Sequence, residues 1–240
     1  LAADDKCGEA YAYRGHSYFY LNNSDAAIED YKKAIKYKAL PPEMGYMFLG
    51  LTYSNKEAWK EADDYYQRVI DRFIEEGLGN SPLLIDTYTN KAVAASRLGK
   101  YEEAHQLCKK AIAIQPDDPA IYLAEGKLYI QENQKKKAVK SFDKALTMEP
   151  SAEMWYMVAS AYSDAEYLYQ AKLCFQEAYR IDPNYADIAE KLSVLSLMHN
   201  EIDDFFKYNN ESEHPISEDI ILELLSRPNQ TEEGEQMLRE

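Results

Sequence analysis

The stretch PAIYLAEGKLYIQENQKKKAVKSFDKALTMEP, residues 119–150, decides the fold. Tyr122, Gly126 and Tyr129 stand at offsets 0, 4 and 7, so they share one face of a helix. Ala138 begins the same spacing on a second helix, followed by an aromatic residue and another alanine. The final proline lacks a backbone N–H and ends that helix. The stretch therefore predicts two helices that approach closely at small residues, with aromatic rings filling the space beside them.

The pattern of the second helix occurs five times along the chain. Its leading residues, spaced 35, 42, 34 and 33 apart, are Ala27, Ala62, Ala104, Ala138 and Ala171. An aromatic residue precedes each of them by sixteen places, at Tyr11, Tyr46, Tyr88, Tyr122 and Trp155. One helix pair cannot bury both of its faces, so a period of this length predicts a row of stacked helix pairs.

The array resembles the tetratricopeptide repeat family. The residues that carry the resemblance most clearly are Tyr122, Gly126, Tyr129, Ala138, Phe142, Ala145 and Pro150, then Trp155, Ala159, Tyr162, Ala171, Phe175, Ala178 and Pro183. The resemblance implies an all-α fold, a right-handed superhelical solenoid of antiparallel helix pairs closed by C-terminal capping helices. It also implies a scaffold for protein–protein interaction.

We expect the array to cover residues 8–185. Its units are expected at about 8–41, 43–81, 85–118, 119–151 and 152–185. Capping helices are expected over 186–208, the second of them over 201–208, and a polar linker with an acidic amphipathic tail over 209–240. The long spacing between the second and third units predicts one long helix over 58–76, ended by a glycine turn.

Some units depart from the family pattern. The leucine expected three places after the first aromatic is replaced by Arg14, Lys91 and Glu125. The third unit has Ala95 and Cys108 where aromatic residues are usual. We expect the interfaces at these positions to pack less well.

The composition narrows the class of ligand. Apolar residues make up 46% and charged residues 29%, which is too apolar for a disordered chain. The net charge of −15 disfavours nucleic acids and anionic membrane surfaces as ligands. No apolar stretch approaches the ~20 residues needed to span a bilayer, and no signal peptide is visible. A leader or domain removed before Leu1 stays open, and the wide spacing of three cysteines leans weakly toward a reducing, cytoplasmic compartment.

No motif predicts chemistry within the chain. The four histidines lie far apart, without the His-x3-His spacing of a zinc site, and there is no Gly-x-Ser-x-Gly elbow or phosphate loop. Cys108 and Cys174 are expected to be buried free thiols. We therefore expect no enzyme activity, no catalytic or metal-ligating residue and no cofactor.

The resemblance implies that first helices line a concave surface that holds peptides or partner helices. Carried over to this chain, the candidate peptide-binding residues are Tyr13, His16, Tyr20, Met44, Met47, Phe48, Leu51, Asn90, Arg97, Leu123, Lys127, Tyr156 and Met157. The first half of this set is apolar and aromatic, which favours apolar anchors on the ligand.

One subclass of the family clamps the C-terminal carboxylate of chaperones with lysine, asparagine and arginine. The corresponding positions hold Ala12, His16, Asp86 and Asn90, so that ligand is not expected.

Two other hypotheses stay open. The stripe Ile220, Ile221, Leu224 and Leu225, on a helix expected to begin at Ser217, could occupy the groove of its own or a neighbouring chain, so a homo-oligomer is possible. Alternatively, the chain could be the regulatory part of a larger enzyme or of a transport or assembly complex. The sequence does not name the partner.

Overall fold

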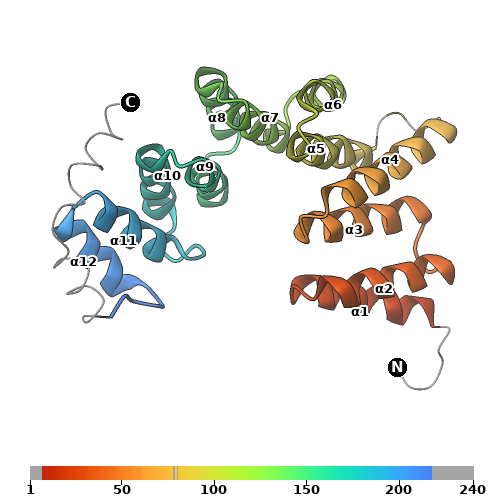
Figure 1. Cartoon of the computed structure of the whole chain (residues 1–240), viewed down its shortest axis with the longest axis horizontal. Coiled ribbons are helices and arrows are strands. Elements are labelled where there is room, and N and C mark those ends of the chain that lie inside the picture. Colours follow the sequence, from red (N-terminus) through yellow and green to blue (C-terminus); the bar gives the residue numbers. More distant parts are fainter. Residues whose placement is uncertain (1–6, 78, 80, 218–240) are drawn as a thin grey trace. The chain divides into compact units, whose positions relative to one another are not determined.

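The computed structural model describes residues 7–77, 79 and 81–217, and this part of the chain is all-α (Figure 1). Its helices are α1 Gly8–Tyr20, α2 Ser24–Lys36, α3 Pro42–Asn55, α4 Trp59–Glu75, α5 Pro82–Arg97, α6 Tyr101–Ile114, α7 Pro119–Gln131, α8 Lys135–Met148, α9 Ala152–Asp164, α10 Leu168–Ile181, α11 Ile188–Met198 and α12 Ile202–Glu211. The all-α class that the periodicity predicts is confirmed.

The helices pack as sequential pairs. α1 packs on α2, α3 on α4 and α5 on α6, and the same holds for α9 with α10 and α11 with α12. Neighbouring pairs meet through the second helix of one pair, as α2 meets α3, α4 meets α5 and α10 meets α11, and α5 also contacts α7. The chain divides into two compact units, residues 1–141 and 142–240, with α1 to α7 in the first and α9 to α12 in the second.

The core of the first unit consists of the repeated small and aromatic residues. Ala62 and Tyr66 on α4 are fully buried. A Cβ atom placed on Gly50 of α3 would come within 2.5 Å of the Tyr66 ring, so only glycine permits this approach of the two helices. The second unit repeats the arrangement with Ala171 and Phe175 on α10. The predicted close approach at small residues is therefore confirmed.

The helix ends follow local sequence signals. α4 begins after Ala58, and its C-cap is Glu76. Gly77 follows with a φ of +67°, the left-handed conformation that glycine adopts easily. The single long helix expected over 58–76 is thus confirmed.

α12 ends at Glu211, three residues beyond the expected end of the last capping helix. The buried Asn209 side chain in this last turn forms a pair of hydrogen bonds with the backbone of Ile216. These bonds hold the chain that follows against the last turn of α12. The helix expected beyond Ser217, with the stripe over 220–225 and the rest of the tail, lies outside the described residues.

The polar replacements of the family leucine all find partners. The Arg14 guanidinium donates two hydrogen bonds to the Asp30 carboxylate at 2.6 and 2.8 Å. The Ser141 hydroxyl donates to Glu125 at 2.7 Å. Lys91 is paired as well, as described next. The expectation of poorer packing missed these contacts, because it considered each helix face without the residues opposite.

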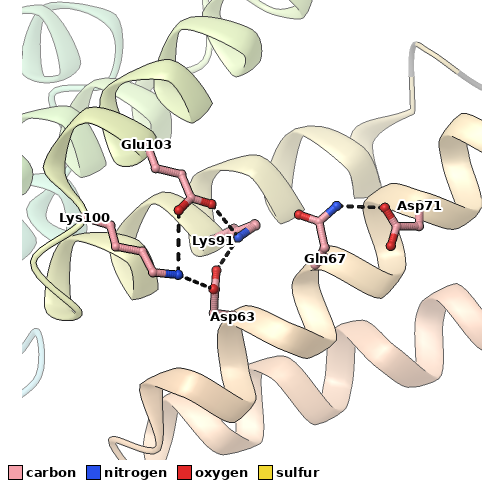
Figure 2. Close-up of polar contacts among 6 residues, drawn as sticks. All are labelled: Asp63, Gln67, Asp71, Lys91, Lys100 and Glu103. Atoms are coloured by element: carbon pink, nitrogen blue, oxygen red, sulfur yellow. Dashed lines mark hydrogen bonds and ion pairs between the residues drawn. The ribbon is translucent and has the colours of Figure 1, made fainter.

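Lys91 lies at the centre of an ion-pair network that joins three helices (Figure 2). Its ammonium donates to Asp63 on α4 and, at 2.9 Å, to Glu103 on α6. Lys100, which precedes α6, donates to the second Asp63 oxygen at 2.9 Å. Burial alone would raise the pKa of Asp63, but the two lysines outweigh burial and lower it. The network ties α4 to the following helix pair through charge.

Candidate protein-binding surface

The predicted binding residues fall into two groups. Most lie on α1, α3, α5 and α7 in the first unit. Tyr156 and Met157 lie on α9 in the second unit.

An aromatic cluster joins α1 to α3. The His16 ring meets Phe48 edge-on at 4.5 Å between ring centres, and Phe48 stacks on Tyr31 of α2 at 5.3 Å. The His16 Nδ1 atom and the Tyr31 hydroxyl are hydrogen-bonded at 2.8 Å. Burial lowers the pKa of His16 and raises that of Tyr31, so both groups favour their neutral forms. These contacts hold the His16 and Phe48 rings in place. Tyr31 itself is 1% exposed, at the aromatic position of the second helix that the repeat pattern assigns to the interface between helices.

Two tyrosines of α1 extend this cluster into solvent. Tyr13 is 73% exposed and Tyr20 is 82% exposed. They stand three residues before and four residues after His16, so all three share one helix face. On α3, Met44 is exposed and Leu51 is half-buried against the core.

Met47 and Leu123 present almost no surface. They are 5% and 6% exposed, respectively. The Thr87 hydroxyl of α5 donates a hydrogen bond to the Met47 sulfur at 3.6 Å. Both side chains contribute to the core of the first unit, so the prediction that they contact a peptide is wrong.

The later helices of the first unit carry polar candidates. The Asn90 side chain donates to its own helix, at the Asp86 carbonyl, at 2.8 Å. The exposed Arg97 guanidinium lies 5.5 Å from the centre of the Trp59 ring. Lys127 is half-buried on α7. Trp59 is one of two tryptophans in the chain. Sequence reasoning missed it because it lies just before the first residue of the second-helix pattern in its unit.

In the second unit, Tyr156 is engaged in contacts of its own. Its hydroxyl donates to the Asp187 carboxylate at 2.5 Å, and its ring meets Phe175 and Tyr185 edge-on. Burial, with Asp187 as the next contribution, raises the pKa of Tyr156 to about 12. Met157 beside it is half-buried. The structure therefore shows Tyr156 as a contact between the last repeat and the chain that follows.

Three other properties of the described residues concern metal-binding clusters, reactive cysteines and membrane-spanning helices. Across residues 7–217, apart from 78 and 80, no three His, Cys, Asp or Glu side chains gather as a metal site would require. Cys108 and Cys174 are buried free thiols, as predicted, and burial raises the pKa of each to about 12. In the same described part, no helix is both long and apolar enough to cross a membrane.

Curated relatives share part of the chain. Human protein O-mannosyl-transferase TMTC3 is 28% identical over 182 residues, which cover 68% of this chain and 20% of the relative. A DnaJ homolog subfamily C member 7 homolog of Dictyostelium discoideum is 27% identical over 160 residues, 62% of this chain and 29% of the relative. The chain thus spans less than a third of the length of these relatives.

Solved structures match the fold. The thermophilic tetratricopeptide protein TTC0263 of Thermus thermophilus has a TM-score of 0.64 at 21% identity, covering 80% of this chain and 100% of that protein. The APC/C hetero-tetramer Cut9-Hcn1 gives a TM-score of 0.61 at 14% identity, covering 88% of this chain and 40% of the matched chain. At these identities the likeness concerns the fold alone.

Family models cover most of the array. Three models described as tetratricopeptide repeat match residues 43–117, residues 96–161, and residues 8–39 together with 152–185. The matches agree with the helix pairs seen in the structure and with the solved tetratricopeptide protein above. The chain therefore belongs to the tetratricopeptide repeat family.

Proposed function

We propose that the chain holds a peptide segment or helix of a protein partner on its first helices, through apolar and aromatic contacts. Domains of this family mediate protein–protein interactions. The observation that supports the particular surface is the aromatic face of α1, where Tyr13 and Tyr20 project beside the fixed His16–Phe48 pair. Tyrosine is enriched among the residues that dominate binding energy at protein interfaces.

The rigidity of this face supports binding. His16 is held by an aromatic neighbour on α3 and by a hydrogen bond to α2. A partner that packs there does not have to order these rings, so less conformational entropy is lost on binding. The exposed tyrosines have only two rotatable side-chain bonds to fix, which also keeps the ordering cost small.

The test is a comparison of Tyr20→Glu with the matched control Tyr169→Glu. Tyr169 on α10 is also exposed, so both variants add the same charge to a solvent-facing tyrosine. Peptides selected from a displayed random library on the full chain serve as probes. We expect Tyr20→Glu to weaken the selected peptides about tenfold, a typical loss for an interface anchor, and Tyr169→Glu to leave them unchanged. Equal affinity for both variants would reject this surface.

The similarity to TMTC3 supports a second proposal, that the module serves as the binding part of a longer enzyme. The matched segment is about a fifth of that protein O-mannosyl-transferase, and we assign the chain no reaction of its own. The isolated chain is then expected to show no mannosyl transfer to a serine- and threonine-containing peptide. Reproducible turnover that a point substitution abolishes would contradict this division of labour.

A further inference from the structure

Arg97 differs from the other arginines that the structure describes. Arg14 pairs with a carboxylate at 2.6 Å, and Arg68, Arg72 and Arg180 pair with carboxylates on or next to their own helices. Within the described part of the chain, Arg97 has no carboxylate partner, although the protein carries 42 acidic residues. Its guanidinium lies over the Trp59 ring instead.

The Trp59 ring contacts the Arg97 guanidinium, which lies 5.5 Å from the ring centre. Trp59 is the first residue of α4 and packs against the core of the first unit. Arg97 is the last residue of α5, and α4 contacts α5. A guanidinium stacked on an aromatic face keeps its edge free, and that edge carries N–H donors in the fork geometry that matches a carboxylate.

Two other residues lie on the same face of α5 as Arg97, an apolar one close to it and an acidic one at the far end of the helix. Val93, one turn earlier on the same face of α5, is half-buried. Asp86 shares this face eleven residues before Arg97, which is about 16 Å along the helix axis. That separation exceeds the Debye length of about 8 Å at physiological salt, so Asp86 does not neutralise the cation. The face is therefore acidic at the start of α5 and basic at its end.

We propose that Arg97, held on Trp59, binds the side-chain carboxylate of an aspartate or glutamate in an extended partner peptide. An apolar side chain next to that acid packs on Val93. Charge complementarity selects the acid at Arg97. In the reversed direction the acid would lie beside Asp86 and be repelled, which favours one direction of the peptide. The inference rests on the proposed function and adds the chemistry of the partner.

The probes are twelve-residue peptides, N-acetylated and C-amidated, with one glutamate among leucine and phenylalanine residues. A matched set carries glutamine in place of glutamate. Binding to the full chain is measured by fluorescence anisotropy. Because a hydrogen bond to a charged group is lost, we expect the exchange of glutamate for glutamine to weaken binding about tenfold. Arg97→Gln is expected to cause a similar loss with the acidic peptide and none with the amide peptide.

Two further variants sharpen the test. Arg97→Lys keeps the charge but loses the fork, so its affinity is expected between those of the native chain and Arg97→Gln. Lys109→Gln, on the exposed side of α6, makes the same change in net charge and is expected to leave binding within about twofold. Circular dichroism checks that each variant keeps the native helix content.

The outcomes separate the two proposals. If the losses from the peptide exchange and from Arg97→Gln multiply, the groups are not coupled. The inference is then overturned while the proposed function stands. A third set carries glutamine and a free C-terminal carboxylate. If this set binds as tightly as the amidated glutamate peptides, the carboxylate recognised is that of the chain end, and this also overturns the inference. If neither peptide set binds while library-selected peptides do, the inference is overturned and the proposed function stands. If the library yields no binder either, both fail.

Discussion

Replacing Lys91 by leucine restores the residue that the family pattern favours, yet we expect the protein to lose stability. The Lys91 side chain is 4% exposed, and its ammonium bonds Asp63 and Glu103 (Figure 2). Glu103 and Lys100 are far more open to solvent, so losing the contact to Glu103 costs little. The cost arises at Asp63, which is largely buried and keeps Lys100 as its remaining partner.

The magnitude follows from these contacts. A hydrogen bond between charged groups contributes about 1.5–3 kcal/mol. The buried leucine recovers part of this through the hydrophobic effect, so we expect Lys91→Leu to cost about 1–2 kcal/mol. Asp63→Ala leaves the buried ammonium with Glu103 alone, and we expect a cost of about 2–3 kcal/mol. The double variant has no buried charge, so its loss should be at least about 1.5 kcal/mol smaller than the sum of the single losses.

The assay is urea denaturation of the full chain, followed by circular dichroism at 222 nm, with the four proteins of the double-mutant cycle measured together. The control cycle uses Arg68→Leu and Asp64→Ala, since this pair on α4 is exposed at 50% and 58%. Its coupling should stay below about 0.5 kcal/mol. Additive losses in the Lys91–Asp63 cycle would refute the argument that the buried network couples α4 to α5.

Three other expectations follow from local environments. Gly50→Ala should lower the free energy of unfolding by about 1–3 kcal/mol because the new methyl group meets a buried tyrosine ring. Gly79→Ala, with no neighbour within 4 Å, should change it little in the same urea denaturation assay. Burial lowers the pKa of His16 in the folded state, so its stabilising contribution is present above the unfolded value of 6.5 and is lost as the pH falls through the folded value. Melting temperatures measured between about pH 8 and pH 5 should therefore fall less in His16→Gln than in the native chain. The same pH dependence in both proteins would disprove this. Of the three cysteines, only the exposed Cys7 should react quickly with Ellman's reagent at about pH 8, and rapid modification of all three in the native protein would count against the burial of the other thiols.

The sequence by itself determined the repeating fold. Small and aromatic residues at offsets 0, 4 and 7 specify helix faces, because the α-helix repeats every 3.6 residues. The small residue at Gly50 and the long helix before Gly77 both belong to patterns that can be recognised within one helix. These features are local, so a periodic pattern suffices to predict them.

The tertiary structure decided which candidate residues form a surface. Met47 and Phe48 are neighbours in sequence and were equal candidates, yet Met47 is buried against α5 while Phe48 packs beside His16. Periodicity shows which face of a helix a side chain lies on. It does not show how far the adjacent helix buries that side chain.

The tertiary structure also decided the polar contacts. Lys91 meets a carboxylate 28 residues earlier in the chain, and Arg97 meets the Trp59 ring across two helices. The sequence around each residue does not identify its partner. Whether the two side chains meet depends on how far one helix pair is displaced relative to the next. That displacement is set by the packing of the whole interface, so the pairing of charges became visible only in the folded chain.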